Sequence, residues 1–150
     1  MNKKNLIVAA AIGAALSIAA AGGVALAHHA FAAEFDGKSP VLLRGKVTRV
    51  EWINPHAWVH IAAVGPGGAT TAWMVEGGTP NTLLRSGIDR NSLKPGTEII
   101  VRGYQSKDKL CRPACKANGR DVTFPDGKKL FMGSSGTGAP VDGSDASEKK

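Results

Sequence analysis

Two adjacent histidines near the N-terminus offer the clearest chemistry in this chain. His28 and His29 directly follow Ala25-Leu26-Ala27, a small-residue pattern typical of a signal-peptidase cleavage site. Cleavage after Ala27 leaves His28 as the N-terminal residue, with a free amine beside its own imidazole. These two nitrogens can chelate one ion, and a planar nitrogen set suits Cu(II). The sequence therefore predicts a copper site at the mature N-terminus.

Other side chains could complete this metal set. A second imidazole from His29 or His56 would fill the nitrogen plane, and Glu34 or Asp36 could add an axial oxygen. The alternative is that the two N-terminal histidines lie on a mobile terminus and bind metal only adventitiously.

His56 and His60 are too far apart along a strand to share an ion. Four residues of extended chain span about 13 Å, whereas two imidazoles on one ion each lie ~2.0–2.1 Å from it. They could meet only if Asn54-Pro55-His56 curls back as a turn. His56 is thus predicted either to receive the N-terminal arm or to hydrogen-bond this turn, and His60 to lie on a solvated sheet face.

Two tryptophans define a second candidate site. Trp58 and Trp73 fall on strands expected to form one hairpin, so a cross-strand pair is predicted. Together with His60 they could bind an organic ligand or haem on the sheet. The alternative is that the indoles pack in the core or under the N-terminal arm.

The two cysteines are four residues apart, in Cys111-Arg-Pro-Ala-Cys115. Two cysteines in a small exported protein usually pair, so a disulfide is expected. The alternative is a thiolate site for Cu(I).

No recognised catalytic constellation is visible in the sequence. A nucleophile elbow, a phosphate-binding glycine loop and a His-Glu-x-x-His motif are all missing, so a non-enzymatic protein is predicted. The chain carries 19 Lys and Arg against 12 Asp and Glu, and loss of Lys3 and Lys4 with the signal peptide reduces this surplus by two. The remaining basic residues form no run, which argues against nucleic acid as a partner.

The elements that must position these residues follow from periodicity and turn signals. Residues 1–27 read as a signal peptide, with no stable membrane anchor after cleavage, although Leu6–Ala27 is long enough to span a bilayer if uncut. Residues 28–40 form a polar arm, 41–132 the folded domain and 133–150 a disordered tail. Strands are expected at Val41–Trp52 (with Gly45 at a bulge or bend), 57–62, Thr71–Glu76, Thr97–Tyr104, Arg120–Phe124 and Lys128–Met132.

A short helix is expected between the third and fourth strands. Thr79 is its N-cap, Pro80 its first residue and Gly87 its end, with Leu83 and Leu84 as core-facing side chains. Three strands, a helix and then further strands predict an all-β domain with one short helix, built as a small OB-like five-stranded β-barrel. A small open sandwich is the alternative.

The motifs also resemble a known family. The patterns are HHxFxxEFD from His28, EWxNPH from Glu51, GxPxxL from Gly78 and NGRDxxFPDG from Asn118. They resemble a family of small exported bacterial proteins of unknown function over about residues 28–140. The resemblance implies an exported single-domain protein with no established activity. The strand order is also similar to that of periplasmic OB-fold proteins and of the haem chaperone of cytochrome c maturation, an analogy of fold that carries over no residues.

Taken together, the sequence predicts a periplasmic or secreted binding or accessory protein with copper as its leading ligand. One alternative is a carrier or chaperone of an organic ligand or haem. The other is an interaction module that docks on a larger periplasmic protein.

Overall fold

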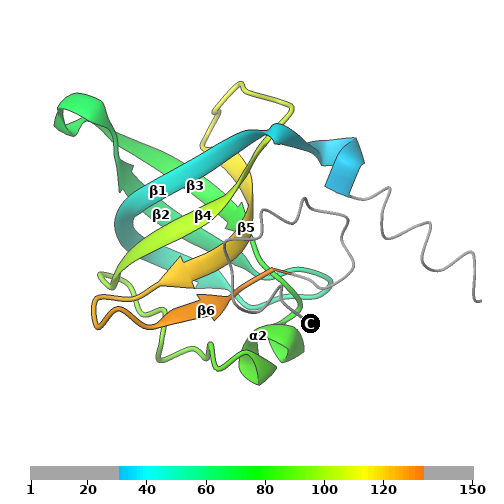
Figure 1. Ribbon diagram of the computed structural model, residues 1–150, viewed down its shortest axis with the longest axis vertical. Helices are drawn as coiled ribbons and strands as arrows, with labels where there is room; N and C mark the ends of the chain where they lie inside the picture. Colours follow the sequence, from blue (N-terminus) through cyan, green and yellow to red (C-terminus); the bar gives the residue numbers. More distant parts are fainter. Residues whose placement is uncertain (1–30, 134–150) are drawn as a thin grey trace, which may run out of the picture.

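The computed structural model describes residues 31–133, which form a small β-domain with one short α-helix (Figure 1). Its elements, in chain order, are β1 (Phe35–Glu51), β2 (Trp58–Val64), the 3-10 turn η1 (Pro66–Gly68), β3 (Thr70–Glu76), α2 (Pro80–Arg85), β4 (Glu98–Ser106), β5 (Cys115–Thr123) and β6 (Lys129–Phe131).

The sheet closes on itself. β1 pairs with β2 and β4, β2 pairs with β3, and β4 pairs with β5, all in antiparallel fashion. A parallel pairing of β3 with β5 joins the two ends into a ring of five strands, and β6 adds to β5 outside the ring. The predicted all-β class with an OB-like strand order, a helix between the third and fourth strands and closure of the sheet is confirmed.

β1 is long enough to serve both halves of the ring. It runs for 17 residues, and an extra residue between Val47 and Arg49 shifts its register against β2, which increases the local bend. The sequence predicts a bulge or bend at Gly45, but the bulge lies between Val47 and Arg49. A Cβ on Gly45 would lie 2.1 Å from the carbonyl oxygen of Ala62, so glycine is needed for the close approach of β1 to β2.

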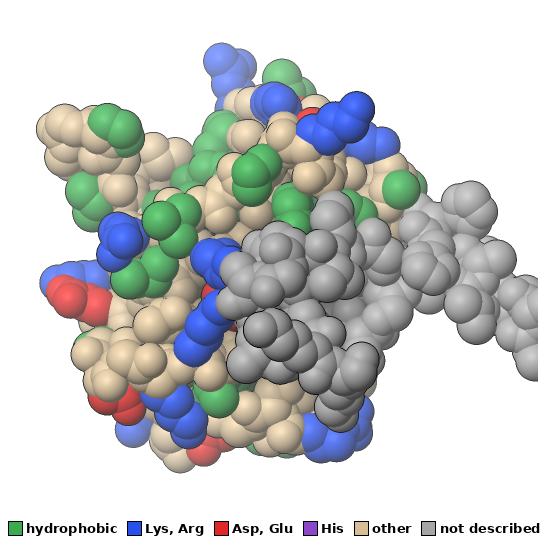
Figure 2. Space-filling view, in the orientation of Figure 1, with side chains coloured by type: hydrophobic (Ala, Val, Ile, Leu, Met, Phe, Trp, Pro, Cys, Tyr) green, Lys and Arg blue, Asp and Glu red, His purple; other side chains and the backbone are tan. Residues whose placement is uncertain are grey.

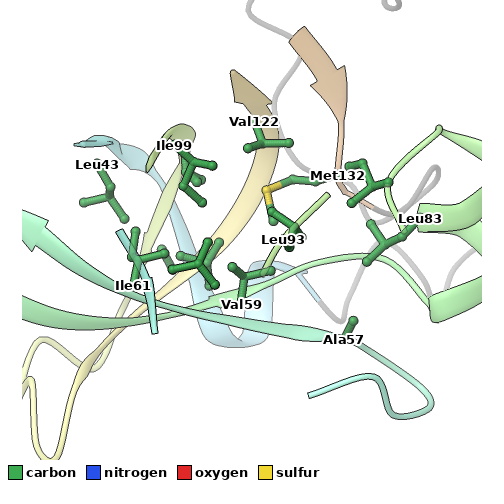
Figure 3. Packing of buried hydrophobic residues seen from close by; sticks show 14 of the residues in the cluster. Leu43, Ala57, Val59, Ile61, Leu83, Leu93, Ile99, Val122 and Met132 are labelled. Atoms are coloured by element: carbon green, nitrogen blue, oxygen red, sulfur yellow. The ribbon is translucent and has the colours of Figure 1, made fainter. Parts of the chain in front are cut away.

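The core fills the inside of the ring. Alternate residues of each strand point inward, as the period of a β-strand requires, and they meet side chains from the loops, α2 and Met132 (Figure 3). Fully buried members include Val47, Val59, Ile61, Val75, Val101, Val122 and Leu83.

α2 lies at one end of the ring, beside β6 (bottom of Figure 1). The Thr79 hydroxyl accepts a hydrogen bond from the Thr82 backbone N–H at 3.1 Å, and Pro80 occupies the first turn, so the predicted start is confirmed. Leu83 is buried in the core, but Leu84 is 54% exposed. Only one of the two leucines can face the ring because successive helical residues diverge by about 100° around the axis.

Several predicted boundaries change. β1 begins at Phe35 rather than Val41, so the arm predicted over 28–40 is in part a strand, and residues 31–34 form a helical turn. β5 begins at Cys115 rather than Arg120. The predicted signal peptide (1–27) and tail (134–150) lie outside the described residues. Within residues 31–133, no helix has the length and apolar character needed to cross a membrane.

Candidate functional site

Polar and metal-binding side chains collect on the outer side of β2, β3 and β5. His60 of β2 pairs directly with Met74 of β3, and Met74 pairs with Lys116 of β5. One step along the strands, Trp58, Glu76 and Asn118 form the next row. Since the residues between them point into the core, these six side chains share one surface, here called the outer face.

The outer face occupies the part of the fold that binds ligands in OB barrels. In that fold the second and third strands, with the loops after the first and fourth strands, form the usual binding surface. The corresponding loops here are residues 52–57, which contain His56, and residues 107–114, which contain Cys111. Fold-level likeness identifies the surface but not its ligand.

His56 lies against the buried end of this face. Its Nδ1 atom is buried and finds no hydrogen-bond partner within residues 31–133. The closest carboxylate oxygen, Oε1 of Glu76, is 3.8 Å away, which is too long for a hydrogen bond. The Asn118 amide donates to the same Oε1 atom at 3.3 Å. The imidazole and the carboxylate therefore face each other across a gap that neither of them fills.

The electrostatics of Glu76 reflect its burial. Glu76 is 8% exposed, and the loss of hydration raises its pKa above the ordinary value of 4.5. The positive field of His56 lowers this pKa, and the negative charge of Glu34 raises it. The Asn118 hydrogen bond and the charge of Lys116 also lower it. Glu76 is thus a carboxylate kept out of water and facing nearby cationic groups.

The chain segment before β1 packs beside this site. Phe31 contacts Phe35 and Tyr104 with ring centroids 5.7 Å apart in both pairs, and the three rings form a small buried cluster. The Glu34 carbonyl accepts hydrogen bonds from the Lys107 backbone at 2.9 Å and the Ser106 hydroxyl at 3.3 Å. Residues 31–35 are therefore held on β4.

Glu34 extends from this segment toward the outer face. Its Oε1 atom lies 3.8 Å from Lys116 Nζ, and its charge acts on Glu76. The segment that directly follows His28 and His29 thus ends beside the outer face.

His60 has a different environment from His56. Its Nε2 atom is 2.8 Å from Glu51 Oε1, and Arg49 Nη2 binds the same oxygen at 2.7 Å. His60 is only 9% exposed, so the expectation of a solvated imidazole is wrong. The two histidines thus lie beside different carboxylates: His56 faces Glu76 without a hydrogen bond, and His60 contacts Glu51.

The predicted tryptophan pair is also wrong. The hairpin register places Trp58 opposite Glu76, and Trp73 opposite Ile61. The two indoles are thus three residue pairs apart and point to opposite sides of the hairpin. Trp73 packs against the core, while Trp58 belongs to the outer face. Whether Trp58, His60 or Trp73 binds a ligand stays a prediction.

The cysteines behave as expected. The sulfur atoms of Cys111 and Cys115 lie 1.98 Å apart, at disulfide distance, and the Cα atoms are 3.7 Å apart. Cys115 is the first residue of β5 and pairs with Trp73 across the parallel seam. The disulfide thus closes the loop at the start of the strand that completes the ring.

His28 and His29, the predicted N-terminal ligands, lie outside the described residues. Among residues 31–133, no three His, Cys, Asp or Glu side chains come together as a ready metal site. Another carboxylate, Asp121, is fully buried and accepts hydrogen bonds from Arg102 Nε at 2.9–3.0 Å. Asp121 therefore joins β4 to β5.

Sequence reasoning missed Met74 and did not place Glu76 in a site. Counting outward equally from Gly65-Pro66-Gly67-Gly68 would pair His60 with Trp73. In the structure Ala69 also belongs to the connection, so Val64 pairs with Thr70, and His60 pairs with Met74. The turn residues alone therefore leave the register uncertain by one residue, which is enough to exchange the two faces of a strand.

The basic residues form no single patch on the side of the molecule that Figure 2 shows. Lys and Arg side chains are spread over that side among apolar ones.

Comparison with known proteins supports a family but no activity. Neither a curated protein nor a solved structure matches the chain. Residues 14–112 match a family of unknown function, DUF6152. The match extends from before the predicted cleavage site to the loop before β5, and so includes β1 to β4, His56 and most of the outer face. The chain belongs to the DUF6152 family.

Proposed function

We propose that this protein is an exported, non-enzymatic copper-binding module whose site combines the mature N-terminus with His56 and Glu76. The amine and imidazole of His28 supply two nitrogens, His56 supplies a third and Glu76 an oxygen. The observation that carries the proposal is the buried Nδ1 of His56, which faces a carboxylate at 3.8 Å without a hydrogen bond.

This gap has the right size for a metal ion. Metal–nitrogen and metal–oxygen bonds of ~2.0–2.2 Å place two ligand atoms up to about 4 Å apart, and the His56–Glu76 separation falls within that limit. Cu(II) favours several nitrogen donors in one plane, which the N-terminal residue and His56 together provide. The charge of Glu76 balances part of the charge of the ion.

The length of the arm allows this arrangement. Tyr104, Asn118 and Glu76 lie side by side on β4, β5 and β3, so Tyr104 and Glu76 are two strand spacings, about 10 Å, apart. Phe31 packs on Tyr104. His28 precedes Phe31 by three residues, which span at most ~10 Å, a length comparable to the separation of Tyr104 and Glu76.

The test compares two versions of the exported protein in Cu(II) competition with a chelator. One begins at His28, as verified by an intact mass for residues 28–150, and the other carries one alanine before His28. The extension preserves every imidazole but converts the amine into an amide. We expect the extended protein to bind Cu(II) at least ~100-fold more weakly than the native one. Loss of a hydrogen-bond partner of a metal ligand alone can cost that much.

A pair of histidine variants locates the rest of the site. His56→Gln should weaken Cu(II) binding by about tenfold or more, whereas His60→Gln, on the other carboxylate, should leave it unchanged. Equal affinities of the native and extended proteins would contradict the proposal, as would an exported protein that retains residues 1–27.

A further inference from the structure

We infer that the outer face carries a second metal site, selective for Cu(I), formed by Nδ1 of His60 and the thioether sulfur of Met74. This site goes beyond the proposed function, because it uses neither the N-terminus nor His56. The two sites can therefore succeed or fail separately.

The hairpin register brings the two ligands together. His60 and Met74 are direct partners across β2 and β3, and their side chains share the outer face. Direct partners in an antiparallel pair have Cβ atoms about 4.5–5.5 Å apart, so an imidazole and a thioether at these positions can both reach one ion. Met74 is half-buried and His60 nearly so, which protects the ion while leaving a route to it.

His60 is oriented as a metal ligand. Glu51 lies 2.8 Å from Nε2 and is itself held by Arg49 at 2.7 Å. Metal-binding histidines commonly donate their second ring N–H to a carboxylate, which fixes the tautomer and the ring orientation. With Nε2 held in this way, Nδ1 is the nitrogen left to bind an ion.

The donor atoms select the metal. A thioether is a soft ligand and favours Cu(I) over harder divalent ions. Lys116, the partner of Met74 on β5, carries a positive charge that Glu34 at 3.8 Å balances only in part. Such a neighbour penalises a divalent ion more than a monovalent one.

Trp58 lies next to the inferred Cu(I) site and provides a fluorescence readout of binding. It precedes His60 by two residues on the outer face and is diagonal to Met74, within reach of a large aromatic side chain. The face of an indole attracts a cation. An ion bound between His60 and Met74 should therefore alter the fluorescence of Trp58.

The experiment uses the protein with one alanine before His28, so that the N-terminal amine cannot contribute. Cu(I) is supplied anaerobically as its acetonitrile complex without a thiol reductant, which keeps the Cys111–Cys115 disulfide intact. Affinity is measured by competition with a chromogenic Cu(I) chelator. Met74→Leu should weaken binding by about tenfold or more and abolish the change in tryptophan fluorescence.

The chain provides a matched control. Met132 carries the same thioether but is buried in the core, 1% exposed, so Met132→Leu should leave Cu(I) affinity unchanged. His60→Gln retains an amide N–H for Glu51 and should lose binding as Met74→Leu does. Trp58→Phe should bind Cu(I) without the fluorescence change. Equal Cu(I) affinity in Met74→Leu and Met132→Leu, with both variants folded by circular dichroism, would overturn the inference.

Discussion

The β2–β3 hairpin carries two different kinds of surface on one backbone. Its inner side holds Val59, Ile61 and Val75, which are at most 1% exposed and touch only the core. Its outer side holds His60, Met74 and Glu76, the immediate sequence neighbours of those residues. Because side chains alternate along a strand, core residues and residues with polar or metal-binding side chains are direct neighbours in the sequence.

The two sides are buried to a similar extent, but they differ in how the free-energy cost of burying polar groups is offset. His60 and Glu76 are 9% and 8% exposed, nearly as buried as the core. An apolar side chain gains free energy when it leaves water, whereas a buried polar group must find a partner. His60 has found one in Glu51, but His56 Nδ1 has none in the described part of the chain. A buried polar atom without a partner thus marks the outer side as more than a solvated sheet surface.

The largest expected effect tests the inner side. Ile61→Ala should lower the free energy of unfolding by about 2–5 kcal/mol, because it removes buried methyl groups and leaves a cavity. Met74→Leu, on the outer side, conserves volume and should cost less than about 1.5 kcal/mol. Urea unfolding of both variants measures this difference. Similar losses of unfolding free energy in the two variants would contradict the distinction between the inner and outer sides.

A second prediction concerns the pH dependence contributed by Glu76 in the metal-free protein. Because burial raises its pKa in the folded state, Glu76 binds its proton more tightly when folded than when unfolded. Its contribution to stability therefore declines as pH rises from about the ordinary value of 4.5 through the raised folded pKa. His56, Glu34, Lys116 and Asn118 are the groups that act on this carboxyl.

Glu76→Gln removes this titration but retains an oxygen that can accept from Asn118. The variant should be more stable than the wild type at neutral pH, and its advantage should shrink toward acid pH. Thermal unfolding across this range provides the measurement. A variant less stable at neutral pH would show that the attraction of His56 outweighs the cost of burying Glu76.

The smallest expected effect comes from a half-buried carboxyl with the opposite shift. Asp89, in the loop after α2, accepts hydrogen bonds from the Ser92 hydroxyl and backbone N–H, each at 2.7 Å, and these hold its pKa below the ordinary value. Asp89 therefore contributes stability above its unfolded pKa, and this is lost as pH falls through its folded pKa.

Ser92→Ala should move the pKa of Asp89 back toward its ordinary value, as measured by NMR titration of the carboxyl. Glu76 should titrate unchanged in that variant. A Ser92→Ala protein in which the pKa of Asp89 stays the same would show that backbone donors alone set it.

The sequence predicted the elements better than the contacts between them. The helix start at Thr79 and both hairpins follow from local turn and cap chemistry, and the structure has each of them. Trp58 and Trp73 do not pair because the hairpin register places them three residue pairs apart, on opposite sides. The first part of β1 was missed because Phe35–Pro40 lacks strand periodicity and is held on β4 at Phe35 and Pro40.

By itself, the sequence determined which segments extend, where they turn and which cysteines lie close enough to pair, because alternation, caps and turns depend on neighbouring residues. Tertiary structure alone decided that β3 and β5 pair in parallel and that the Phe31 segment packs on Tyr104. It also placed Glu76 beside both His56 and Asn118. These contacts join residues 20 to more than 70 positions apart, and they form only when the whole ring closes around a common core.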